Sequence, residues 1–186
     1  MKASTRARDE WLALRCQTGV AGALEDLIAE MEHPLFYYAI QLTGSQDRAL
    51  DVLQEVWIRA LRGIRKLKDP GAVRAWLYNL THAASVDRFR KERARERAEE
   101  AHVEAAGSDV SFSAADAVEI QQALERLEPR YRAVLVLYFL EDFSLEDIAR
   151  ITGAPVGTVK SRLYYAKKAL KDLITKGEVP HHGIQK

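Results

Sequence analysis

Apolar side chains recur every three or four residues along this chain, and alternation at a spacing of two never extends beyond a few residues. A repeat of about 3.6 residues lines apolar side chains along one face of a helix, whereas a half-buried strand requires a repeat of two. The pattern therefore predicts an all-α fold. The length of 186 residues permits one domain or two small ones.

The strongest local pattern lies between residues 143 and 174, which predict a short helix, a tight turn and a longer basic helix. Ser144 is placed to cap the short helix, and Gly153 is placed to end it in the left-handed conformation that glycine favours. One stripe of the second helix is apolar, formed by Val156, Val159, Leu163, Ala166, Leu170 and Leu173.

The other faces of this second helix carry hydroxyl, aromatic and basic side chains: Thr158, Lys160, Ser161, Arg162, Tyr164, Tyr165, Lys167, Lys168 and Lys171. This combination is typical of a helix-turn-helix, whose second helix enters the major groove of duplex DNA. The alternative is an ordinary helical hairpin with a lysine-rich face in solvent. Because the turn spacing and the residue types agree, we favour the helix-turn-helix.

Charges are unevenly distributed, although the formal net charge is only +1. Residues 57–98 include twelve basic and four acidic side chains, whereas residues 99–128 include eight acidic side chains and a single arginine. The helix-turn-helix segment is basic again. Two basic segments separated by an acidic one indicate two nucleic-acid surfaces and a connector of another kind.

Residues 46–64 predict an amphipathic helix. Its expected buried stripe consists of Leu50, Leu53, Trp57, Ala60, Leu61 and Ile64, and its outer face carries Asp51, Glu55, Arg59 and Arg62, with Gln54 at the border. Glu55 and Arg59 are four residues apart, a spacing at which an ion pair contributes a few tenths of a kcal/mol on a helix surface. On spacing alone, a solvated outer face is the favoured interpretation.

A further helix is predicted from residue 73 to about residue 91, with Asp69 as its cap and Pro70 at its first position. One face is apolar, formed by Val73, Trp76, Leu77, Leu80 and Ala84, and the opposite face carries Tyr78, His82, Ser85 and Phe89. The helix ends in Arg88, Arg90 and Lys91. That opposite face could meet bases and phosphates, or its aromatic side chains could pack under a neighbouring helix. Periodicity does not decide between the two.

The first 44 residues predict additional helices. Apolar positions from residue 9 to residue 31, interrupted by Gly19 and Gly22, predict two helices around a loop. Pro34 is expected to open another helix, which Gly44 ends.

Composition changes between residues 92 and 113, where charge blocks and small residues replace any apolar stripe. We therefore predict an N-terminal domain (1–91), a flexible linker (92–113), a C-terminal domain (114–176) and a tail (177–186). Residues 129–140 are apolar on most sides and are expected to form the core of the C-terminal domain.

The single cysteine, Cys16, excludes an internal disulfide and favours a reducing, cytoplasmic location. The first ten residues are polar, so no signal peptide is expected, and the longest apolar run is too short to insert into a membrane. No paired carboxylates, nucleophile–base set or phosphate loop indicates an enzyme. A helical metal-dependent hydrolase using His33, His82 or His102 lacks supporting spacing, so neither a metal nor a cofactor is expected.

Three segments in order resemble bacterial RNA polymerase sigma factors of the extracytoplasmic-function class. They are DVLQEVWIRALR from Asp51, VRAWLYNLTHAASVDRFRK from Val73, and LERLEPRYRAVLVLYFLEDFSLEDIARITGAPVGTVKSRLYYAKKAL from Leu124. The third is shared in style with some response regulators, but the combination in this order is much more specific. The resemblance implies a sigma region 2 helical bundle and a sigma region 4 helix-turn-helix joined by a flexible linker.

The resemblance also implies roles for individual residues. In the family, the first segment docks on a coiled coil of the largest polymerase subunit, so the expected polymerase contacts are Asp51, Gln54, Glu55 and Arg59. The second segment and the loop before it bind the promoter −10 element and hold an extruded base of the non-template strand. The residues expected there are Lys66, Lys68, Asn79, His82, Ser85, Arg88, Arg90 and Lys91. The recognition helix reads the −35 element as duplex, and the residues expected there are Thr158, Lys160, Ser161, Arg162, Tyr164, Tyr165 and Lys168.

The function implied is that of a sigma factor which binds core RNA polymerase and directs promoter-specific initiation, with an anti-sigma factor as a further candidate partner. The alternative is a stand-alone helix-turn-helix regulator, which would have no need of the N-terminal half. Four positions depart from the family: Asn79 and Ala83 stand where an arginine and an asparagine are common, Tyr165 where an arginine is common, and Pro155 where a serine cap is frequent. These departures leave the promoter sequence open.

Overall fold

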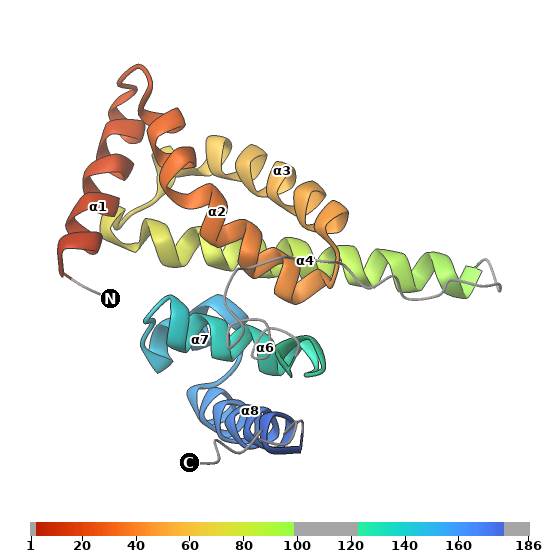
Figure 1. The fold of residues 1–186 in the computed structure, drawn as a ribbon. Coiled ribbons are helices and arrows are strands. Elements are labelled where there is room, and N and C mark those ends of the chain that lie inside the picture. The colour runs from red at the N-terminus through yellow and green to blue at the C-terminus, as the bar shows by residue number, and fades with distance from the viewer. Residues whose placement is uncertain (1–2, 99–122, 177–186) are drawn as a thin grey trace, which may run out of the picture.

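The computed structural model describes residues 3–98 and 123–176, which contain helices and no strand, so the predicted all-α fold is confirmed. The elements in chain order are α1 (Ala3–Thr18), α2 (Ala23–Thr43), α3 (Gln46–Gly63), the 3₁₀ turns η1 (Ile64–Lys66) and η2 (Pro70–Ala72), α4 (Val73–Ala98), α6 (Pro129–Leu135), the π-helical turn η3 (Val136–Leu140), α7 (Leu145–Thr152) and α8 (Val156–Lys176). Figure 1 shows α1 to α4 forming one bundle, with α6 to α8 beneath it.

The helix α2 runs without interruption through Pro34, so the prediction that a new helix begins there is wrong. Proline removes a backbone hydrogen bond and costs about 3 kcal/mol in a helix interior. Met31, Leu35 and Tyr38 lie on one face on both sides of the proline, and all three are fully buried. Burial of this stripe outweighs the local cost. Gly44 ends the helix in the left-handed conformation, as predicted.

The buried face of α3 differs from the predicted stripe. Leu50 and Leu61, which were expected in the core, are 50% and 59% exposed, respectively. The buried residues are instead Ala49, Val52, Leu53, Val56 and Ala60. Apolar residues are adjacent in sequence along this helix, so the periodicity allows two neighbouring stripes. The stripe with an alanine near each end is the one that packs between α2 and α4.

The C-terminal part is built around α6, as expected, because residues 132–137 are all buried. After this stretch the helix widens into η3, whose last three side chains are exposed. Both predicted caps of the helix-turn-helix are confirmed. The Ser144 hydroxyl accepts the backbone N–H of Asp147 at 3.1 Å, and Gly153 ends α7 at a φ of 64°. The helix α8 packs on α6 through Val159, Leu163 and Ala166, which are buried.

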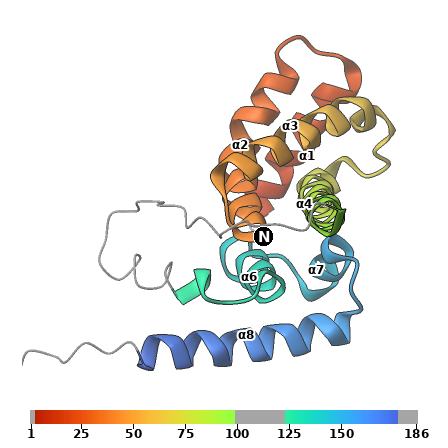
Figure 2. The same cartoon turned by 90° about the vertical axis from the view of Figure 1, so that its right-hand side faces the viewer.

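The N-terminal and C-terminal parts are in contact. The helix α6 packs against α2, and α7 packs against α4, as Figure 2 shows from the side. The helix α4 continues to Ala98, beyond residue 91, where the N-terminal domain was predicted to end. Much of the predicted linker and the whole predicted tail lie outside the described residues, so the domain boundaries stay a prediction.

Candidate nucleic-acid and polymerase interfaces

The outer face of α8 carries the side chains predicted to read duplex DNA. Tyr164 and Tyr165 are 63% and 56% exposed, and their rings meet edge to face at 5.4 Å. Lys160, Ser161 and Lys168 are also exposed, whereas Thr158 and Arg162 are half-buried. Because Val159 and Leu163 are buried, the opposite face of the helix is fixed to the protein. The helix therefore presents a rigid row of donors and aromatic rings, as a recognition helix requires.

Four of the residues predicted to bind the −10 element are exposed basic side chains: Lys66, Lys68, Arg90 and Lys91. The first two precede α4, and the other two lie in its second half. Asp69 caps the η2 turn between them by accepting the N–H of Gly71 at 3.0 Å, which confirms its predicted capping role. Such flexible cations suit contact with phosphate oxygens, which position a nucleic acid without reading its sequence.

The other uncharged or weakly basic members of the −10 set make contacts within the protein. The Asn79 amide donates to the backbone carbonyls of Arg150 and Ile151, both at 3.1 Å. The buried Ser85 hydroxyl donates to the carbonyl of Thr81 at 2.8 Å, which is a local helix contact. Ser85 is therefore placed in the helix packing and faces no open surface in this arrangement.

His82 is largely buried beside Tyr38, whose hydroxyl lies 3.0 Å from His82 Nδ1. Burial, together with the positive charge of Arg162, lowers the pKa of His82 to about 4. The imidazole is therefore neutral at physiological pH. Burial raises the pKa of Tyr38, so its hydroxyl keeps its proton and is available to donate.

The helix face predicted to meet bases or a neighbouring helix does both kinds of thing at different positions. Tyr78 is fully buried, and its ring lies 5.2 Å from the rings of both Tyr38 and Phe143. Packing under neighbouring helices is therefore the correct interpretation for Tyr78. Phe89, two turns further along α4, is 53% exposed and lies among the basic side chains at this end of the helix.

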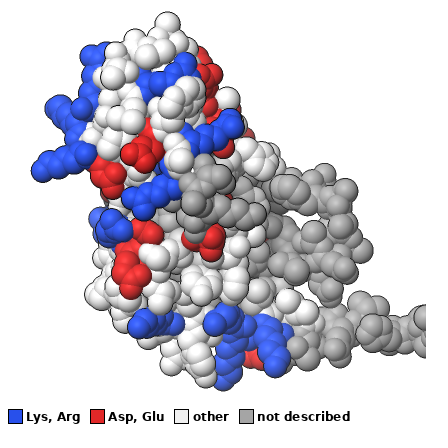
Figure 3. All heavy atoms as spheres, turned by 90° about the vertical axis from the view of Figure 1, so that its left-hand side faces the viewer, with Lys and Arg blue, Asp and Glu red and all other residues white. Residues whose placement is uncertain are grey.

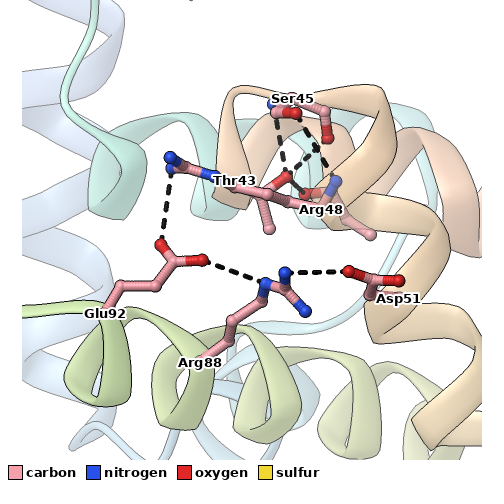
Figure 4. A network of polar contacts seen from close by, with 7 residues as sticks. Thr43, Ser45, Arg48, Asp51, Arg88 and Glu92 are labelled. Carbon is pink, nitrogen blue, oxygen red and sulfur yellow. Dashed lines mark hydrogen bonds and ion pairs between the residues drawn. The ribbon is translucent and has the colours of Figure 1, made fainter. Parts of the chain in front are cut away.

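Arg88 connects the predicted −10 set to the predicted polymerase set. Its guanidinium lies 2.8 Å from the Asp51 carboxylate on α3 and 3.1 Å from Glu92 on its own helix. Arg48 on α3 pairs in turn with Glu92 at 3.5 Å. Figure 4 shows these side chains bridging α3 and α4, next to the turn that Ser45 caps. Arg59 makes a second bridge, pairing with Glu55 and, at 3.6 Å, with Asp87.

The outer face of α3 holds the predicted polymerase contacts together with an apolar row that the sequence did not reveal. Asp51 and Gln54 are exposed, and Glu55 and Arg59 are half-buried. Beside them lie three exposed apolar side chains, Leu50, Ile58 and Leu61, at 50–59% exposure. Exposed apolar side chains that gather within an otherwise polar face are typical of a protein-binding surface. The signal available in the sequence was the surplus of apolar positions on this helix.

Basic side chains stand out along α8 at the lower end of the face shown in Figure 3, and a second group lies at the upper end, where acidic side chains are interspersed. Within the described residues, no helix is long and apolar enough to cross a membrane. In the same part of the chain, no three His, Cys, Asp or Glu side chains are grouped as metal ligands would be. The sites to be explained are therefore the surfaces of α3, α4 and α8.

These features define a class: an all-helical protein with a basic helix-turn-helix at one end and a separate helical bundle bearing a polar and apolar docking face. Two family models match it in order, "Sigma-70 region 2" over residues 17–95 and "Sigma-70, region 4" over residues 117–170. The chain is 30% identical to RNA polymerase sigma factor SigV of Bacillus subtilis, covering 82% of this chain and 91% of that protein. It is 33% identical to the ECF sigma factor EcfG of Rhodopseudomonas palustris, covering 82% and 85%, respectively.

The chain therefore belongs to the sigma factors of RNA polymerase, in the extracytoplasmic-function class, as the sequence predicted. The fold agrees. A Bartonella quintana sigma factor, RpoE, solved in complex with the anti-sigma factor NepR, superposes with a TM-score of 0.72 at 24% identity, covering 85% of this chain and all of that one.

Proposed function

We propose that this chain binds core RNA polymerase through α3, holds the promoter −10 strand with α4 and the loop before it, and reads the −35 element with α8. The observation that carries the proposal is that one chain of this family combines two separate surfaces of different chemistry. The outer face of α3 is mixed acidic and apolar, and the outer face of α8 is basic and aromatic. A stand-alone regulator would use only the second.

For the polymerase contact, the proposal rests on Asp51, Gln54 and Glu55 together with the apolar row of Leu50, Ile58 and Leu61. A desolvated apolar centre with charged side chains around it is the usual anatomy of a specific protein interface. The acidic members would pair with basic residues of the partner, and the apolar members would supply the buried area.

For the −10 element, the exposed cations Lys66, Lys68, Arg90 and Lys91 would hold phosphates, and Asn79 and His82 would meet an extruded base. Extrusion costs a few kcal/mol, which stacking and polar contacts must offset. Phe89 lies next to these cations and is exposed, so its ring is a candidate stacking surface. For the −35 element, Lys160 and Lys168 would bind phosphates, and Arg162, Tyr164 and Tyr165 would meet base edges or thymine methyl groups.

We further propose that the N-terminal part to about residue 91 and the C-terminal part from about residue 114 act as the two promoter-binding domains, joined by the predicted linker. The protein would act in the cytoplasm, with no catalytic activity of its own. An anti-sigma factor is a candidate third partner, because the similar sigma factor from Bartonella quintana was solved bound to one.

The deciding experiment is selection of promoters from a random-sequence library by core polymerase reconstituted with this chain, followed by run-off transcription. We expect a −35 element and a −10 element at a fixed spacing, with no transcript from core polymerase alone. Enrichment of duplex sites by the chain alone, without polymerase binding, would favour the stand-alone regulator instead.

A further inference from the structure

The carboxyl end of α7 rests on the middle of α4, at a residue proposed to meet the promoter strand. The last carbonyls of a helix have no partner within that helix and need one from elsewhere. Two of them, from Arg150 and Ile151, accept hydrogen bonds from the Asn79 amide, each at 3.1 Å. Asn79 thus caps the first helix of the helix-turn-helix, although 71 or more residues separate it from its partners in the sequence.

An aromatic seam continues this contact into the core. The ring of Phe143, the residue that precedes the Ser144 cap, meets the Tyr78 ring edge to face at 5.2 Å. Tyr78 meets Tyr38 of α2 at the same separation. Phe143 is 5% exposed, and the two tyrosines are fully buried. The C-terminal part is therefore packed into the N-terminal bundle and buries apolar side chains there.

Charged groups flank the seam on both sides. Arg74, which lies one turn before Tyr78, pairs with Glu141 of the C-terminal part at 3.4 Å, and both side chains are nearly buried. One turn after Tyr78, His82 is covered, and its pKa is lowered by burial and by the positive charge of Arg162 on α8. Contacts with the C-terminal part therefore extend along α4 from Arg74 to His82, which is the stretch that contains Asn79.

We infer that the C-terminal helix-turn-helix is an intramolecular competitor for the −10 strand: in the closed chain, α7 and Phe143 occupy the face of α4 that a promoter base would use. This inference rests on the proposed function, because it takes Asn79 and His82 as contacts of that base. The Asn79 amide cannot donate to the α7 carbonyls and to a base at once. The two parts must separate before the strand is held, whereas the exposed face of α3 is open to polymerase in the closed chain.

The test measures the distance between the two parts in the full-length free protein. Spin labels are attached at Glu10→Cys on α1 and Asp172→Cys on α8, both exposed positions, with Cys16→Ser removing the native thiol. We expect one narrow distance distribution. Glu141→Lys places a second cation against Arg74 and should move a large part of the population to longer distances. Asn79→Ala, read only for distance, should do the same by removing both hydrogen bonds.

Glu146→Lys is the matched control, since it makes the same charge change at an exposed position of α7 itself. Its distances should match those of the unmodified chain. The binding probe is a labelled single strand carrying the −10 sequence recovered by the promoter selection. If nine in ten free molecules are closed, Glu141→Lys should bind this strand up to about tenfold more tightly without polymerase.

The result that would overturn the inference is a broad distribution of long distances in the free chain, or no change of distance in both Glu141→Lys and Asn79→Ala. Unchanged affinity of an opened Glu141→Lys variant for the strand would also overturn it. Loss of the proposed function looks different, because it appears as absence of promoter-specific transcription whatever the distances are. A chain that transcribes but is open when free refutes only the competitor.

Discussion

The carboxylate of Asp51 on α3 lies 2.8 Å from the guanidinium of Arg88 on α4. The first residue was predicted to bind polymerase and the second to bind the promoter strand, so the two predicted sites are adjacent and share an ion pair. Both side chains remain partly exposed, at 51% and 35%. Exposed pairs contribute only about 0–1 kcal/mol to stability, so each partner remains available to an external ligand.

Reversing the charge of the acidic pair on α3 should separate these roles. We expect Asp51→Lys with Glu55→Lys to abolish binding to core polymerase in a pull-down, while circular dichroism shows an unchanged helical content. The swapped variant Asp51→Arg with Arg88→Asp restores an ion pair between α3 and α4. If Asp51 acts by touching polymerase, the swap should not recover binding; recovery would show that its role is only to hold Arg88.

The apolar row on α3 should contribute to the same contact. Burying one such side chain in an interface is worth about 1.5–3 kcal/mol. Ile58→Glu and Leu61→Glu should therefore each weaken polymerase binding by about tenfold or more, measured by titration with labelled polymerase. Leu14→Glu, at an equally exposed apolar position on α1, is the control and should bind normally. Equal losses in all three variants would point to general insolubility.

Local rules predicted much of the fold, because caps and turns depend on neighbouring residues. The Ser144 cap, the Gly153 stop and the Gly44 stop needed only a short window of sequence. Where packing overrides a local preference, the rules failed: the break expected at Pro34 is absent because the helix buries apolar residues on both sides of it.

The site was harder to predict, because its decisive contacts join distant parts of the chain. Periodicity identified the aromatic and polar face of α4 but could not say that Tyr78 is in the core and Phe89 at the surface. Choosing between Leu50 and Ala49 as the buried position required the neighbouring helices. The contact between Asn79 and Ile151 has no sequence signature, because any exposed-looking amide could cap a distant helix.

Replacing Arg162 should test base readout by α8. If Arg162 contacts a base edge, Arg162→Ala should weaken binding to the selected −35 duplex by about 1–3 kcal/mol and relax the preference at one base pair. Lys167→Ala removes an exposed cation from the same helix, outside the predicted contact set, and serves as the control. Fluorescence anisotropy with matched and mismatched duplexes measures both effects. An identical loss on all duplexes would assign Arg162 to a phosphate.

Acid should destabilise the fold through His82. Burial and the charge of Arg162 lower its pKa to about 4 in the folded chain, against an ordinary value of 6.5. Below pH 6.5 the unfolded chain takes up a proton that the folded chain does not. The contribution is therefore complete above pH 6.5 and is lost as pH falls to about 4, amounting to roughly 3 kcal/mol at most.

Urea unfolding of the parent chain and of His82→Gln at pH 7 and pH 4.5 isolates this contribution, because the carboxylates titrate alike in both proteins. The parent chain should lose more stability between these two pH values than the variant does. Equal losses would show that the ring is protonated without penalty in the folded chain.

The most stability should depend on the buried pair of Arg74 and Asp9. Two hydrogen bonds, of 2.7 and 3.2 Å, join the guanidinium to a carboxylate that is fully buried. Removing one partner of a buried pair costs about 3–5 kcal/mol, because it leaves the other charge without compensation. Asp9→Asn should fall at the lower end of that range, since Glu141 still lies 3.4 Å from Arg74.

Replacing both partners by apolar residues, as in Asp9→Leu with Arg74→Met, removes the uncompensated charge and should recover most of the lost stability. Urea unfolding measures all three proteins, and the double variant should lie much closer to the parent chain than Asp9→Asn does. A loss below about 1 kcal/mol in Asp9→Asn would mean that water reaches this pair. The anchor between α1 and α4 would then have to be sought in the apolar contacts of Leu12 and Leu77.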